Sequence, residues 1–149
     1  MPATEFPFST TIEVRFRDID AMGHVNHAVF FTYMETARFR FFDRFLDITR
    51  PGETPFILGE TSCRYLSPLL LGETVTVGLG VARFGNKSFT MIFHLEGDIA
   101  RPVAVGRAVL VMYDYEKEQT IPVPPEFKAQ VQTFQSDWQP PQDPAGKPN

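Results

Sequence analysis

The chain has 149 residues, and its 14 Lys and Arg residues against 18 Asp and Glu residues give a net charge of −4. This balance offers no basic field for a phosphate backbone and argues against general nucleic-acid binding. A single cysteine, Cys63, excludes an internal disulfide and cannot alone form a structural zinc site. No window contains the roughly 18 uncharged apolar residues of a membrane helix, so we expect a cytoplasmic protein without a membrane partner.

The first predicted element is a half-buried strand over residues 10–17. Ile12, Val14 and Phe16 fall on one face of this strand, and Thr11 and other polar residues fall on the opposite face.

A helix is predicted over residues 27–46, a stretch without Gly or Pro. Its apolar residues step by 4, 3, 4 and 4 positions and share one side of the helix: Phe30, Met34, Ala37, Phe41 and Phe45. Six of the 15 Phe residues lie in this stretch, so the apolar sector is wider than a surface helix requires. We therefore expect another part of the chain to wrap around it. Asn26 is the predicted N-cap, because its side-chain oxygen can accept a backbone N–H of the first turn.

Beyond Pro55 the pattern changes to period two, which predicts four strands within residues 56–70, 73–84, 87–97 and 102–114. Gly85-Asn86 suits a tight hairpin turn, and successive hairpins imply antiparallel pairing. The fold class is therefore α+β, with the helix packed on one sheet face. A short last helix is expected over residues 126–134. We predict one domain over residues 1–134 and a disordered, Pro-rich tail over residues 135–149.

The polar residues concentrate between the first strand and the helix, in the segment RDIDAMGHVNH (residues 17–27). Two carboxylates and two imidazoles lie there, directly before a helix N-terminus whose unpaired N–H groups favour an anion or a developing oxyanion. A carboxylate at this place, beside a slot lined by Phe, can attack or activate water against a carbonyl.

Other interpretations of this segment are weighed against catalysis. A calcium loop starting at Asp18 is rejected, because Met22 and Val29 stand where oxygen ligands are required. A metal site made by Asp20, His24 and His27 lacks a second cluster of ligands, so we expect no metal. A purely structural interpretation, with aspartates shaping a turn and a capping Asn26, stays open on the residues alone.

The stretch VRFRDIDAMGHVNHAVFFTYMETAR (residues 14–38) resembles the opening of the 4-hydroxybenzoyl-CoA thioesterase family of hotdog-fold proteins. The residues that fit the family pattern are Arg15, Asp18, Asp20, Gly23, His24, Asn26, Glu35, Ala37 and Arg38. CRYLSPLLLGETVTV is similar to the family's Y-x-x-P-x-x-x-G-[DE] segment, and the likeness covers about residues 10–116. It implies a hotdog fold, in which a curved antiparallel sheet wraps a long central helix.

The resemblance also implies hydrolysis of an acyl-CoA thioester without a cofactor or metal. Asp20 aligns with the family's catalytic carboxylate and would act as nucleophile or as general base. Backbone N–H groups near Asn26 and His27 would polarise the thioester carbonyl. His24 would orient the substrate, although a structural role in the turn stays open for it.

Four further residues are candidates for substrate binding. Tyr65 and Ser67 would border the channel in which the family binds pantetheine. Arg83 and Lys87 flank the predicted hairpin and are candidates for the CoA phosphates. Solvated strand charges explain Arg83 and Lys87 equally well. A strand end at Pro68 is the structural explanation for Tyr65 and Ser67.

Family likeness implies a homodimer or homotetramer with active sites at the interface of two joined sheets. Two alternatives to a thioesterase remain: a hotdog hydratase or dehydratase acting on acyl-CoA or acyl-carrier protein, and a non-catalytic acyl-CoA binding module. The identity of the acyl group and of its carrier stays open.

Overall fold

An antiparallel sheet makes up most of the molecule. The computed structural model describes residues 1–46 and 54–141. The strand order is β1-β3-β4-β5-β2, and a short strand β6 pairs with β5. The strands are β1 (Phe8–Glu13), β2 (Phe56–Tyr65), β3 (Thr74–Phe84), β4 (Ser88–Glu96), β5 (Pro102–Asp114) and β6 (Gln119–Thr120). Among the described strands β2 pairs with β5 alone, so it forms one edge of the sheet.

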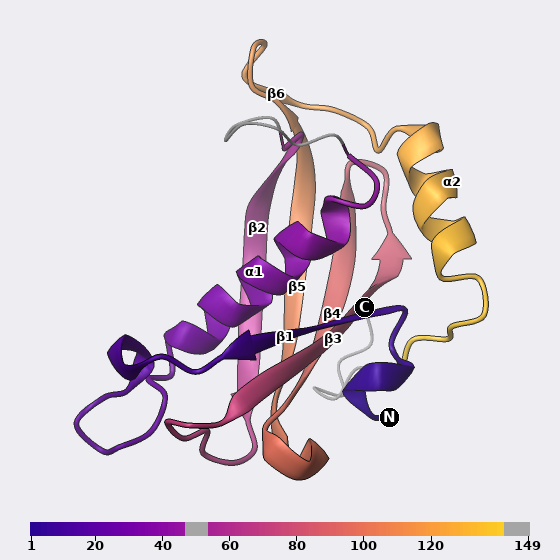
Figure 1. Cartoon of the computed structure of the whole chain (residues 1–149). Coiled ribbons are helices and arrows are strands. Elements are labelled where there is room, and N and C mark those ends of the chain that lie inside the picture. Colours follow the sequence, from indigo (N-terminus) through magenta and orange to yellow (C-terminus); the bar gives the residue numbers. More distant parts are fainter. Residues whose placement is uncertain (47–53, 142–149) are drawn as a thin grey trace.

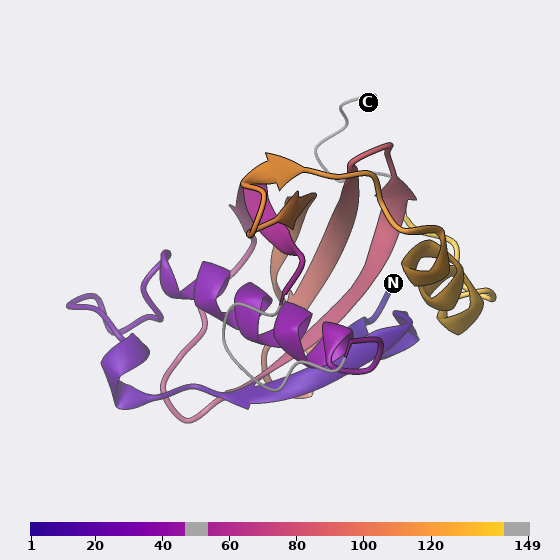
Figure 2. The same ribbon diagram turned by 90° about the horizontal axis from the view of Figure 1, so that it is seen from above.

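The helix α1 (Val29–Phe42) lies across the concave face of this sheet (Figures 1 and 2). Phe30, Met34 and Phe41 on α1 are at most 3% exposed, and they pack against strand residues of the core. Gly106 on β5 permits the close approach of the helix, because a Cβ there would lie 2.6 Å from the Met34 side chain. The expected helix wrapped by a curved antiparallel sheet, in the α+β class, is confirmed.

The elements before the sheet differ in their bounds from the sequence prediction. The first strand ends at Glu13, and Phe16–Asp18 forms a 3₁₀ turn, η2, in which Phe16 is 82% exposed. α1 begins at Val29, two residues later than predicted, because residues 27 and 28 form a turn. Asn26 caps this turn rather than the helix: its Oδ1 accepts the Ala28 N–H at 3.0 Å.

Two further 3₁₀ turns, η1 (Ala3–Glu5) and η3 (Asp98–Ala100), and a second helix, α2 (Pro125–Phe134), complete the described elements. α2 closes the end of the core beside the last turn of α1, where Phe127 contacts the rings of Phe42 and Phe89. Beyond α2, Trp138 packs over Gly80 of β3. The packed part of the chain therefore extends past the predicted boundary at residue 134, while residues 142–149 lie outside the described residues.

None of the helices in the described part of the chain is long and apolar enough to span a membrane.

Candidate active site

The segment between η2 and α1 is a closed loop fixed by backbone hydrogen bonds. Ile19 and Val25 pair as a short antiparallel bridge, and the Asp20 N–H donates to the His24 carbonyl at 2.9 Å. Gly23, at the turn, has φ +82°, a conformation that costs glycine little. The loop therefore presents its side chains from a defined backbone.

Asp18 holds this loop from the inside. Its carboxylate is 2% exposed and accepts hydrogen bonds from the Arg15 N–H at 2.9 Å and the Tyr33 hydroxyl at 2.8 Å. Burial acts to raise the pKa of Asp18, but these donors and the Arg15 guanidinium outweigh it and hold the pKa below its ordinary value. Its backbone carbonyl also accepts the Asn26 N–H at 2.8 Å, so Asp18 ties both ends of the loop together.

Asp20 points outward from the same loop and is half-buried. Its Oδ1 accepts the Met22 N–H at 2.9 Å, and its second carboxylate oxygen has no partner among the described residues. Asp20 lines a pocket of about 340 Å³, which we call the Asp20 pocket. His24, His27, Phe30 and Tyr65 contribute to the same pocket. One oxygen of an oriented carboxylate is thus available to a ligand there.

His27, directly before α1, lines the same pocket and carries a backbone donor. The Asn26 N–H is already engaged by Asp18, so it is not available to a ligand. The His27 N–H has no acceptor within residues 1–46 and 54–141, and the Tyr65 hydroxyl donates to the His27 carbonyl at 2.7 Å and so holds this peptide. Because the helix dipole adds positive potential at this end, the His27 N–H is suited to an oxyanion.

Ser67 lies in the pocket wall, but its hydroxyl is occupied. It donates to the Pro102 carbonyl at 2.7 Å and accepts from Arg101 at 2.8 Å. Arg101 also donates to the Pro68 carbonyl at 2.7 Å and pairs with Glu73 at 2.5 Å. Sequence reasoning missed Arg101 and Glu73 as supports of this wall, although Glu73 closes the quoted Y-x-x-P-x-x-x-G-[DE] segment.

The structure does not bring Arg83 and Lys87 to Asp20 within one chain. The pocket wall ends at Leu69, a few residues before β3 begins at Thr74. Arg83 lies near the other end of this strand of 11 residues. At about 3.3 Å per residue the two ends of β3 are roughly 30 Å apart.

Cysteine-based catalysis finds little support in the structure. Burial raises the pKa of the Cys63 thiol to about 11, so the thiolate needed for nucleophilic attack is scarce near neutral pH. Within residues 1–46 and 54–141, no group of three or more His, Cys, Asp or Glu side chains is placed to hold a metal ion.

A curved antiparallel sheet wrapped around one helix, with a polar loop at the start of that helix, defines a hotdog-fold protein. The chain belongs to the thioesterase-like superfamily, whose family model matches residues 14–131.

Three similar proteins align with most of this chain. A thioesterase from Thermus thermophilus, whose crystal structure holds coenzyme A and Zn, is 34% identical with a TM-score of 0.80, over 89% of this chain and 97% of that chain. The structure of a predicted thioesterase from Bacillus stearothermophilus is 25% identical with a TM-score of 0.82, over 90% of this chain and 98% of that one. The uncharacterized protein YsmA of Bacillus subtilis strain 168 is 25% identical over 118 residues, which are 79% of this chain and 80% of YsmA.

Proposed function

We propose that this protein hydrolyses the thioester bond of an acyl-CoA, with Asp20 as the catalytic carboxylate. The observation that carries the proposal is the placement of Asp20: one oxygen is fixed by the Met22 N–H and the other is unpartnered among the described residues, at a pocket beside the start of α1. The likeness of residues 14–38 to the 4-hydroxybenzoyl-CoA thioesterase pattern and the coenzyme A held by the Thermus relative support the same substrate class.

Asp20 acts in one of two ways. As general base it takes a proton from water, and the resulting hydroxide adds to the thioester carbonyl. As nucleophile it adds to the carbonyl itself and forms a mixed anhydride that water then hydrolyses. In both cases the tetrahedral oxyanion accepts the His27 N–H, the C–S bond breaks, and CoA leaves as a thiolate that takes up a proton. His24 and Tyr65, at the pocket wall, orient the substrate.

The test is thiol release from a panel of acyl-CoAs by wild type and by Asp20→Asn. The variant keeps a side-chain oxygen for the Met22 N–H, so the loop is preserved while the carboxylate is lost. We expect thiol release to fall by at least about 10²-fold, with ligand binding little changed. Asp43→Asn, an exposed aspartate beyond α1, is the matched control. Unchanged hydrolysis by Asp20→Asn would exclude the mechanism.

The alternatives predict different products. A hydratase adds water to an enoyl-CoA without releasing thiol, and a binding module binds acyl-CoA without converting it. The same assays, run with an enoyl-CoA and with binding measured in parallel, separate these cases. Arg83→Ala and Lys87→Ala test the predicted phosphate contacts, and an increase of KM without a change of kcat supports them.

We also propose a homodimer formed through β2. Within residues 1–46 and 54–141 no strand pairs with the outer edge of β2, and apolar side chains are exposed along the strand: Ile57 at 37%, Leu58 at 46% and Tyr65 at 44%. Such an edge pairs readily with a second copy. Light scattering during gel filtration should show a dimer or a tetramer built from it, and Leu58→Glu should dissociate the β2 contact. A cytoplasmic location stays a prediction from the sequence.

A further inference from the structure

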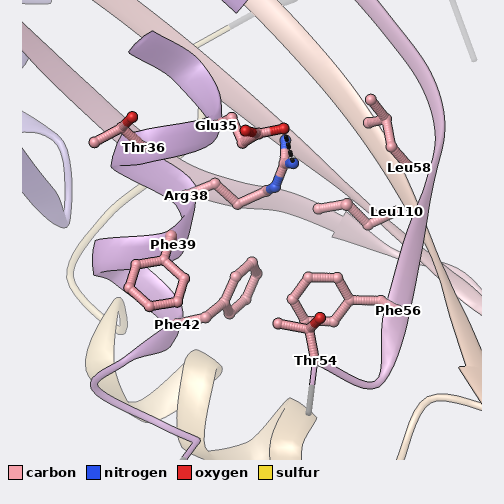
Figure 3. Close-up of a pocket in the computed structure, with 9 residues that line it drawn as sticks. All are labelled: Glu35, Thr36, Arg38, Phe39, Phe42, Thr54, Phe56, Leu58 and Leu110. Carbon is pink, nitrogen blue, oxygen red and sulfur yellow. Dashed lines mark ion pairs between the residues drawn. The ribbon is translucent and has the colours of Figure 1, made fainter. Parts of the chain in front are cut away.

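A second pocket, larger than the Asp20 pocket, lies between the C-terminal half of α1 and the start of β2 (Figure 3). It has a volume of about 430 Å³, and we call it the α1–β2 pocket. Its walls are mostly apolar and are formed by Phe39, Phe42, Phe56, Leu58 and Leu110. Two residues of the family pattern, Glu35 and Arg38, line this pocket, but the Asp20 mechanism does not use the space.

Arg38 is the cation in this apolar surrounding. Its side chain is 12% exposed, and Figure 3 shows it extending from α1 toward Leu58 and Leu110. Within the described residues its guanidinium has one ionic partner, Glu35, at 3.9 Å, which is beyond hydrogen-bond distance. The Glu35 side chain is 72% exposed, so water screens most of its attraction.

Burying the Arg38 guanidinium among apolar side chains costs free energy unless an anion binds it at hydrogen-bond distance. Burial already lowers the pKa of Arg38, with Glu35 opposing the shift, and this direction agrees with a guanidinium short of a counter-ion. Arg is well suited to the missing group, because its planar fork binds a carboxylate through two parallel N–H donors.

Symmetry connects this pocket with the reacting carboxylate. In one chain the two pockets lie along β2, one near Phe56 and the other near Tyr65, and on α1 their lining residues Phe30 and Glu35 are about 8 Å apart along the helix axis. A two-fold axis normal to the sheet pairs two β2 strands antiparallel and keeps both α1 helices on the same face. The Phe56 end of one protomer then lies beside the Tyr65 end of the other.

We propose that the α1–β2 pocket of one protomer receives the acyl group whose thioester is held at Asp20 of the other, and that Arg38 selects acyl groups ending in a carboxylate. This inference rests on the proposed thioesterase function and on the β2 dimer. It names the substrate class as the CoA monothioesters of dicarboxylic acids, with the aromatic and aliphatic walls holding the carbon chain between the two charged ends.

The first experiment compares adipoyl-CoA with hexanoyl-CoA, which has the same chain length but ends in a methyl group. Wild type should favour adipoyl-CoA in kcat/KM by about tenfold or more. Arg38→Met should lose that preference and keep its rate on hexanoyl-CoA within about threefold, because an apolar residue suits the pocket. Arg40→Met is the matched control, since Arg40 lies on the exposed side of α1 and donates to Thr10 and to the Thr11 carbonyl. Equal losses on both substrates, or a wild type without preference, would overturn the proposal.

A second experiment tests the arrangement across the dimer. Asp20→Asn and Arg38→Met chains carrying different affinity tags are co-expressed, and the hybrid dimers are purified through both tags. If Asp20 works with Arg38 of the partner subunit, each hybrid holds one intact site and should retain about half of the wild-type activity on adipoyl-CoA. If both residues serve the same site from one chain, every site carries a defect and activity stays at the level of the variants.

Binding separates a failure of this inference from a failure of the proposed function. Should no acyl-CoA of the panel be hydrolysed, the thioesterase proposal fails, and the pocket is tested directly with free adipate and hexanoate by calorimetry. Adipate binding that wild type shows and Arg38→Met lacks supports the carboxylate site. Equal binding of both acids, or none, contradicts it.

Discussion

The Tyr33 hydroxyl donates a hydrogen bond of 2.8 Å to Asp18 Oδ2. Tyr33 lies on α1 and Asp18 lies at the start of the loop that carries Asp20, and both side chains are 2% exposed. This bond joins the central helix to the catalytic loop inside the core. It explains why a buried carboxylate stands two residues before the one that faces the pocket.

Removing the Tyr33 hydroxyl should destabilise the protein more than removing a tyrosine hydroxyl that makes no hydrogen bond. Tyr33→Phe keeps the ring but leaves the buried Asp18 with fewer donors, so we expect a loss of about 1.5–3 kcal/mol in the free energy of unfolding. Tyr113→Phe is the control, because the half-buried Tyr113 hydroxyl has no hydrogen-bond partner in the described residues. Urea unfolding of both variants measures the difference. Equal losses would show that the Asp18 contact contributes little.

The lowered pKa of Asp18 predicts how stability depends on acid. The folded state favours the ionised carboxylate, so its contribution is complete above the unfolded pKa, which is near 4, and is lost as pH falls through the lower folded pKa. Asp18→Asn should therefore have a lower free energy of unfolding than wild type at pH 7. The difference between the two free energies should become smaller toward pH 2. Urea unfolding at a series of pH values measures it. A difference in unfolding free energy that stays constant with pH would contradict an ionised Asp18 carboxylate in the folded protein.

Most of the fold was predictable because it depends on local periodicity. The 3.6-residue apolar pattern around Phe30 and Phe41 and the period-two pattern after Pro55 identify α1 and four strands, and their order implies an antiparallel sheet around a helix. The bounds at Glu13 and Val29 were not predictable, because they depend on where the chain leaves the sheet and turns.

The site was predictable only in part, because its supports come from distant segments. The family motif identifies Asp20 and His24 as candidates. It does not show that Asp18 already takes the Asn26 N–H, or that Arg101 occupies the Ser67 hydroxyl 34 residues away. The burial of Arg38 likewise depends on β2, which follows it in the chain. Such contacts arise from tertiary packing, which no local pattern encodes.

Cys63 should react slowly with thiol reagents in the folded protein. Its thiol pKa of about 11 means that little thiolate is present at pH 8, and burial restricts access further. We expect modification by a disulfide reagent at pH 8 to be at least about tenfold slower than in urea-unfolded protein. Cys63→Ser should keep thiol release from acyl-CoA. Loss of that activity in a folded Cys63→Ser variant would indicate that the thiol takes part in the reaction.

The segment after α2 should stabilise the sheet from its outer side. Gln135 makes two hydrogen bonds with the Val81 backbone, accepting from its N–H at 3.1 Å and donating to its carbonyl at 2.7 Å. Trp138 covers Gly80, where a Cβ would lie 2.8 Å from the indole ring. A chain ending at Phe134 loses both contacts and should unfold at a lower temperature than a chain ending at Pro141, by about 4 °C or more. Gly80→Ala, which displaces the ring without shortening the chain, should lower the melting temperature in the same direction. Equal melting temperatures for the two truncated chains would show that this segment adds nothing to stability.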